Sequence, residues 1–136
     1  MARVFRGKVA IPGEQMDAYL EALGQFERAK EPLRAQLEQY ADDFARTLAH
    51  QYAPKTVRKH TAIIALFIEF VCWQTDVERL EEITRGMTNS AFRQWYLRKV
   101  GDRTESELKT AVRKFFQFLA QDKGVRNEAI LKSLPR

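Results

Sequence analysis

The sequence predicts an all-α fold, a bundle of four principal helices preceded by an extra N-terminal helix. Apolar residues recur every three or four positions through most of the chain, which is the spacing of an amphipathic helix. Nowhere does the strict alternation of a strand run long enough to support a sheet. The connections between the periodic segments are short, as is typical of a compact bundle in which successive helices pack as neighbours.

Composition and charge restrict the class of protein. A chain of 136 residues that is 45% hydrophobic can bury one ordinary core without disulfide or metal support. The formal net charge of +5 favours an anionic partner. Charged residues interrupt the N-terminus, which argues against a secretory signal, and the longest apolar stretch, residues 62–68, falls far short of the ~20 residues that span a bilayer. We therefore expect a soluble, cytoplasmic protein with no membrane partner.

The N-terminal part of the chain is predicted to be an extension with one helix. Residues 1–12 alternate weakly and end at a Pro-Gly pair, which fits either a short strand or an ordered tail. An amphipathic helix is expected within residues 14–30, and it should stop before Pro32, because the residue preceding a proline disfavours the helical conformation. We accordingly divide the chain into an extension, 1–30, and a helical domain, 31–136.

Two long helices are expected next, near residues 33–50 and 54–73. The first has a continuous stripe of large apolar side chains at steps of three or four. The second begins at Pro54, a residue favoured in the first helical turn because its missing N–H costs nothing there. From Thr61 onward this helix is apolar nearly all round, with Cys72 as a buried thiol, so we place it at the centre of the bundle.

The second half of the chain is predicted to contain two further principal helices and a short terminal one. A connection over residues 76–86, pinned by Leu80 and Ile83, leads to a helix near 88–100. A short helix near 129–134 ends the chain.

The last long helix, near 104–122, has two possible starts. Both Asp102-x-x-Glu105 and Thr104-x-x-Glu107 fit a capping box, in which two side chains satisfy exposed backbone donors at a helix N-terminus. The sequence does not decide between them.

No motif in the sequence indicates catalysis, a metal or a cofactor. The two histidines, His50 and His60, are not spaced as metal ligands, and His60 falls beside apolar residues as a packing side chain. The adjacent carboxylates Asp42 and Asp43 point in different directions on a helix, so we interpret them as solvated surface. Most aromatic side chains lie on stripes that a bundle must bury, and Trp95 is the one retained as a candidate for stacking on a base.

Basic residues gather at two places along the chain. Residues 55–60, at the start of the second long helix, contain no acid, and a second basic stretch runs through 93–103. Helix N-termini present free N–H groups to phosphates, and basic side chains add charge there. The alternative is that a basic helix start is merely solvated surface with no specific function.

Four segments, in order along the chain, resemble motifs of one known family. They are A-P-K-T-V-R-K-H at 53–60 with F-I-E-F-V at 67–71, L-E-E-I-T at 80–84, F-R-Q-W-Y-L at 92–97, and A-V-R-K-F-F-Q-F-L at 111–119. These are similar to S-P-K-T-V-R-x-Y with F-x-x-F-L, L-x-E-I-T, F-x-x-Y-L and A-V-R-R-x-F-x-Y-L of tyrosine recombinases and phage integrases. The segments lie in the family's N-terminal core-binding, or SAM-like, domain.

The resemblance implies a fold, a function and a set of partners. It implies an orthogonal bundle that forms half of a clamp on duplex DNA and acts in DNA integration and recombination. The catalytic half of that clamp, with its nucleophilic tyrosine and arginines, has no matching positions, so a non-catalytic module without metal or cofactor is implied. Duplex DNA, and further recombinase protomers, are the implied partners. The chain is then either an excised domain or a stand-alone relative.

The candidates for DNA contact lie at or near the two helix starts where the resembling family meets the duplex. They are Lys55, Thr56, Arg58, Lys59, Arg103, Thr104, Ser106, Lys109, Thr110 and Arg113. Two features depart from the family: Glu105 and Glu107 would repel phosphate, and Asn127 is followed by Glu128 where the family usually has proline. Glu105, Glu107 and the added N-terminal helix favour an alternative, a helical protein-interaction module that kept the fold without DNA binding. An enzyme is the least favoured interpretation.

Overall fold

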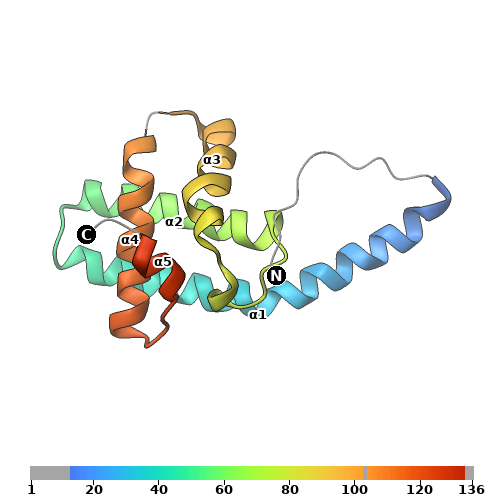
Figure 1. Cartoon of the computed structure of the whole chain (residues 1–136), viewed down its shortest axis with the longest axis horizontal. Coiled ribbons are helices and arrows are strands. Elements are labelled where there is room, and N and C mark those ends of the chain that lie inside the picture. Colours follow the sequence, from blue (N-terminus) through green and yellow to red (C-terminus); the bar gives the residue numbers. More distant parts are fainter. Residues whose placement is uncertain (1–12, 103, 134–136) are drawn as a thin grey trace.

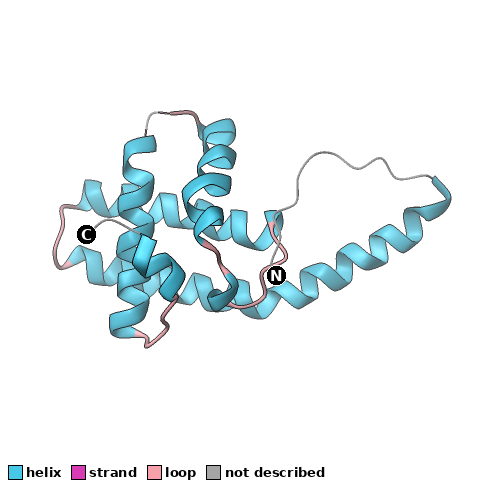
Figure 2. Cartoon of the chain, in the orientation of Figure 1, coloured by secondary structure: helices cyan, strands magenta, loops and turns pink. Residues whose placement is uncertain are grey.

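The computed structural model describes residues 13–102 and 104–133, with the side chains of residues 132 and 133 excepted. Within these residues the chain forms five α-helices and no strand, which confirms the predicted all-α fold (Figures 1 and 2). The helices are α1, Met16–Ala49; α2, Pro54–Gln74; α3, Phe92–Val100; α4, Glu105–Asp122; and α5, Glu128–Ser133. Short turns of 3-10 helix at Gly13–Gln15 (η1) and Leu80–Glu82 (η2), and a π-helical turn at Met87–Ala91 (η3), complete the described elements.

The predicted break before Pro32 is wrong, because α1 is one helix that runs through this proline. Its neighbours explain why the helix continues. The ammonium group of Lys30 is buried and donates hydrogen bonds to the carbonyl oxygens of Val71, at 3.1 Å, and of Val77. Leu33, on the other side of Pro32, is buried in the core. These contacts fix the helical path on both sides of the proline and offset the backbone hydrogen bond that it removes.

The first part of α1 extends away from the rest of the molecule (Figure 1). Three large apolar side chains of this part are exposed: Met16 is 44% exposed, Tyr19 43% and Leu20 53%. Tyr19, about five helical turns before Leu37, lies on the same side of α1 as this buried core residue. α1 thus spans both sides of the predicted boundary after residue 30, whereas the choice between a strand and a tail for residues 1–12 falls outside the described residues.

The bundle places α2 at its centre, as predicted. α1 and α2 lie side by side, and α3 and α4 run across them (Figure 1). The ring of Phe67 on α2 lies with its centroid 5.1 Å from that of Phe92 on α3 and 6.0 Å from that of Phe116 on α4. Cys72 and His60, both expected to pack inside, are buried as well. The angle at which α4 crosses α2 determines which residues of the two helices lie next to each other on the surface.

The connection before α3 is fixed from two sides. Leu80 and Ile83 are buried, as predicted, and their carbonyl oxygens each accept a hydrogen bond of 2.9 Å from the amide of Asn127. The side-chain oxygen of Asn127 accepts a bond from the backbone N–H of Ile130, at 3.2 Å, at the start of α5. This single buried amide therefore joins the connection to the C-terminal helix.

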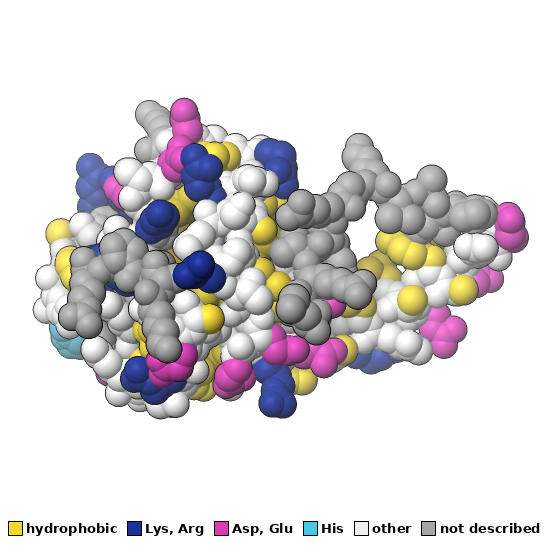
Figure 3. Space-filling model, in the orientation of Figure 1, with side chains coloured by type: hydrophobic (Ala, Val, Ile, Leu, Met, Phe, Trp, Pro, Cys, Tyr) yellow, Lys and Arg dark blue, Asp and Glu magenta, His cyan; other side chains and the backbone are white. Residues whose placement is uncertain are grey.

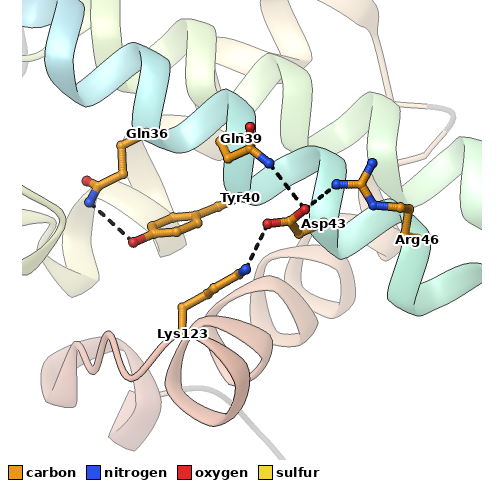
Figure 4. Close-up of polar contacts among 6 residues, drawn as sticks. All are labelled: Gln36, Gln39, Tyr40, Asp43, Arg46 and Lys123. Atoms are coloured by element: carbon orange, nitrogen blue, oxygen red, sulfur yellow. Dashed lines mark hydrogen bonds and ion pairs between the residues drawn. The ribbon is translucent and has the colours of Figure 1, made fainter.

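An ion-pair cluster joins α1 to the end of α4 (Figure 4). The carboxylate of Asp43 lies 2.8 Å from the ammonium of Lys123, and it accepts hydrogen bonds from Arg46 and, at 3.3 Å, from Gln39. The bonds from Lys123 and then Arg46 lower the pKa of Asp43 to about 2. Asp42 is exposed, as predicted for both carboxylates, whereas Asp43 is half-buried and structural.

Candidate nucleic-acid interface

The start of α2 presents exposed cations around an uncapped helix end. Lys55, Arg58 and Lys59 are exposed and Thr56 is half-buried. No side chain caps the helix at Ala53, and its first turn contains no acidic residue. The backbone N–H groups of a first helical turn have no partner within the helix, so this end combines donors and positive charge in one place.

The start of α4 is arranged differently from either predicted capping box. Thr104 is the residue at the cap position, but its hydroxyl makes a hydrogen bond with the hydroxyl of Tyr96 and none with the helix backbone. Ser106 is exposed and Thr110 is half-buried on the following turns. Arg103, another candidate, lies outside the described residues. The predicted contact residues of α4 therefore differ in solvent exposure, and so in how accessible they are to a ligand.

A salt bridge brings the two helix starts together. The ammonium of Lys59 on α2 lies 3.3 Å from a carboxylate oxygen of Glu107 on α4. About two turns further along α4, Lys114 places its ammonium 4.0 Å from the ring centroid of Tyr52, which precedes α2. Residues that are far apart in sequence thus lie on neighbouring helix surfaces.

Lys109 and Arg113, one turn apart on α4, border different grooves. Lys109 borders a groove of about 520 Å³ between α4 and the η3–α3 segment, and Arg113 borders one of about 630 Å³ between α4 and the end of α1. The first groove is lined by Thr88, Asn89, Arg93, Asp102, Glu105, Ser106, Leu108 and Lys109. The predicted contact residues of α4 therefore spread across its outer face instead of lining one groove.

Several cations of this region are held by carboxylates. Arg93 Nε on α3 donates to a carboxylate oxygen of Glu105 at 2.7 Å, and the ammonium of Lys99 lies 3.2 Å from Glu69 on α2. Arg98, between them in sequence, is exposed. Ion pairs therefore neutralise part of the positive charge that the sequence places here.

Comparison of the chain with protein-family models, curated proteins and solved structures gives no match. The function is therefore argued from the site itself. No described helix is long and apolar enough to cross a bilayer, and no three His, Cys, Asp or Glu side chains of the described residues are grouped to hold a metal ion.

Trp95 is a poor platform for a base. Its indole packs against two core aromatics, with ring centroids 5.6 Å from Phe70 and 6.3 Å from Phe92. The ammonium of Lys99 lies 5.1 Å from the indole centroid. The side chain is half-buried, so the expectation that it is available for stacking is not supported by its surroundings.

Charge is unevenly distributed over the surface. On the face seen in Figure 3, most Lys and Arg side chains lie over the upper part of the bundle, where some acidic side chains also lie, whereas most Asp and Glu side chains lie along the lower edge and on the protruding part of α1. A surface region with more basic than acidic side chains favours an anionic partner.

Two cations of this region were not selected from the sequence. Lys114 is not among the predicted contact residues, although its position on α4 is in phase with Glu107, which faces α2. Arg93 was recognised as part of a basic stretch, but its proximity to α4 was not foreseen. The helical phase of Lys114 was readable from the sequence, whereas the pairing of Arg93 depends on how α3 crosses α4.

Proposed function

We propose that this chain is a duplex-DNA-binding module, similar to the core-binding half of a tyrosine recombinase or integrase clamp and without catalytic function of its own. The observation that favours it most is the Lys59–Glu107 salt bridge, because it joins the basic start of α2 to the start of α4. The exposed cations at the start of α2 then lie beside the first turn of α4, as a phosphate-binding surface built from both helices requires.

The helix arrangement is compatible with the orthogonal, SAM-like bundle of that family. α3 and α4 run across α1 and α2, and the first of the resembling segments, residues 53–71, lies mostly in the central helix α2. In this proposal the module acts in DNA integration or recombination beside a catalytic domain, or beside further recombinase protomers.

Binding is expected to act mainly on the phosphate backbone. Lys55, Arg58 and Lys59 would meet phosphates at the start of α2, where the backbone N–H groups add donors. Ser106, Lys109 and other polar residues of α4 would contact the same duplex beside them. Contacts of this kind position a protein on DNA without reading its sequence, and they release counterions.

A salt titration with a fluorescent duplex tests the proposal. Each phosphate that the protein neutralises contributes about −0.9 to the slope of log K against log salt. Several contacts should give a steep slope, with a dissociation constant near ~10⁻⁴ to 10⁻⁶ M at physiological salt, as for non-specific complexes. Absence of binding at low salt would refute it.

The exposed apolar stripe of α1 favours a second candidate function, a helical protein-interaction module. Met16, Tyr19 and Leu20 lie on a protruding helix whose charged neighbours Asp17 and Glu21 are acidic. Exposed apolar stripes of this kind commonly mark protein contacts. This candidate becomes the leading one if the duplex is not bound.

A further inference from the structure

We propose that Glu105 and Glu107 are intramolecular competitors of phosphate, which hold the DNA-facing cations and keep duplex affinity low. The inference rests on the proposed function and adds the residues that limit it. Binding would require phosphate oxygens to displace these two carboxylates from their cations.

The geometry places each carboxylate where a phosphate would act. Glu107 binds the ammonium of Lys59 on α2, at 3.3 Å, and Glu105 accepts a hydrogen bond of 2.7 Å from Arg93 on α3. The two glutamates thus connect the start of α4 to both neighbouring helices. The side chains of Lys59 and Arg93 remain 45% and 49% exposed, so a ligand can still reach them.

Both carboxylates also lie in the first turn of α4, where they face the positive end of the helix dipole. The positive end of a helix attracts phosphate when no acidic side chain lies there. Carboxylates placed at that end interact with it instead and compete with phosphate. Neither glutamate forms the capping box that the sequence allows, so their side chains are engaged with the neighbouring helices instead.

Glu107 is not well satisfied as a structural residue. One of its carboxylate oxygens binds Lys59, but the other is buried without a hydrogen-bond partner among the described residues. A buried, unpaired carboxylate oxygen opposes folding. Half-exposed ion pairs, in turn, contribute little to stability. Phosphate can therefore replace the two glutamates as the partner of Lys59 and Arg93. The displaced carboxylates stay nearby and repel the phosphate.

The test is the double variant Glu105→Gln/Glu107→Gln, which removes the two charges and keeps the size of the side chains. We expect duplex affinity at low salt to rise roughly tenfold, because two negative charges near the phosphates are removed. The slope of log K against log salt should become steeper by about 0.9 for each of one or two additional phosphate contacts, because Lys59 and Arg93 become available.

The matched control is Glu38→Gln/Glu81→Gln, which makes the same change in net charge at exposed positions on α1 and η2. A control that gains as much affinity as the α4 variant would show that only net charge matters, and would overturn the inference. Circular dichroism shows whether each variant folds. If the double variant does not fold, the single variants Glu105→Gln and Glu107→Gln test each ion pair separately.

The outcomes separate this inference from the proposed function. If the wild type binds the duplex but the α4 variant binds no more tightly than the control, the inference is wrong and the function stands. If no variant binds the duplex at low salt, the proposed function fails, and the inference fails with it.

Discussion

At the scale of single residues, a few buried polar side chains hold parts of the molecule together that the apolar pattern alone does not join. Asn127 links the connection before α3 to α5, and Lys30 links α1 to the end of α2. Desolvation lowers the pKa of Lys30, although nearby acidic groups oppose the shift. Neither role was predicted, because an asparagine or lysine in the sequence gives no sign of which distant carbonyl group it will reach.

His60 should make stability depend on pH. Burial, and then the charge of Lys114, lower the pKa of His60 below its ordinary value of 6.5. Glu107 opposes the shift by less than Lys114 contributes, and Lys59 lowers the pKa slightly further. As the pH falls below 6.5, the unfolded chain takes up a proton at this residue before the folded protein does. Stability should therefore decrease with falling pH from 6.5 down to the folded-state pKa, and then level off.

The variant His60→Gln removes this titration. Urea denaturation of wild type and variant on both sides of pH 6.5 measures it, and we expect the variant to lose less stability on acidification. Equal losses in the two proteins would contradict a buried, neutral imidazole in the folded state.

At the scale of elements, apolar periodicity predicted the helices well and their ends less well. The helices predicted near 54–73 and 104–122 correspond to α2 and α4 within a residue or so, because their large apolar residues repeat at helical spacing. The break at Pro32 was wrong, since burial of Lys30 and Leu33 outweighs the local preference of a proline. The predicted capping boxes did not form for a similar reason. Thr104, Glu105 and Glu107 make contacts with α2 and α3 instead of capping the backbone of α4.

The same element allows a direct comparison of buried and exposed positions. Leu37 and Leu20 both lie on α1, but Leu37 is fully buried and Leu20 is 53% exposed. Leu37→Ala should lower the free energy of unfolding by ~2–5 kcal/mol, whereas Leu20→Ala should change it by less than ~0.5 kcal/mol. Urea denaturation measures both. Similar costs at the two positions would mean that the protruding part of α1 is buried in solution.

At the scale of the whole molecule, the sequence predicted an all-α bundle and the central position of α2, and both are confirmed. It also located the basic helix starts. It could not predict that Lys59 meets Glu107, or that Lys109 and Arg113 border different grooves, because these relations depend on how the helices cross. The DNA-binding function stays a prediction, supported by the proximity of the basic start of α2 to the start of α4.

The most direct test of that function compares salt slopes of duplex binding for the wild type and for Lys55→Ala/Arg58→Ala. These two residues are exposed at the start of α2, whereas Lys59 is held by Glu107. Arg28→Ala/Arg85→Ala, at exposed positions on α1 and before η3, is the control for net charge. The account predicts that the α2 variant binds the duplex more weakly. Its slope of log K against log salt should be shallower by about 0.9 for each of the two lost phosphate contacts, while the control keeps nearly the affinity and slope of the wild type. An α2 variant with the affinity and slope of the wild type would contradict it.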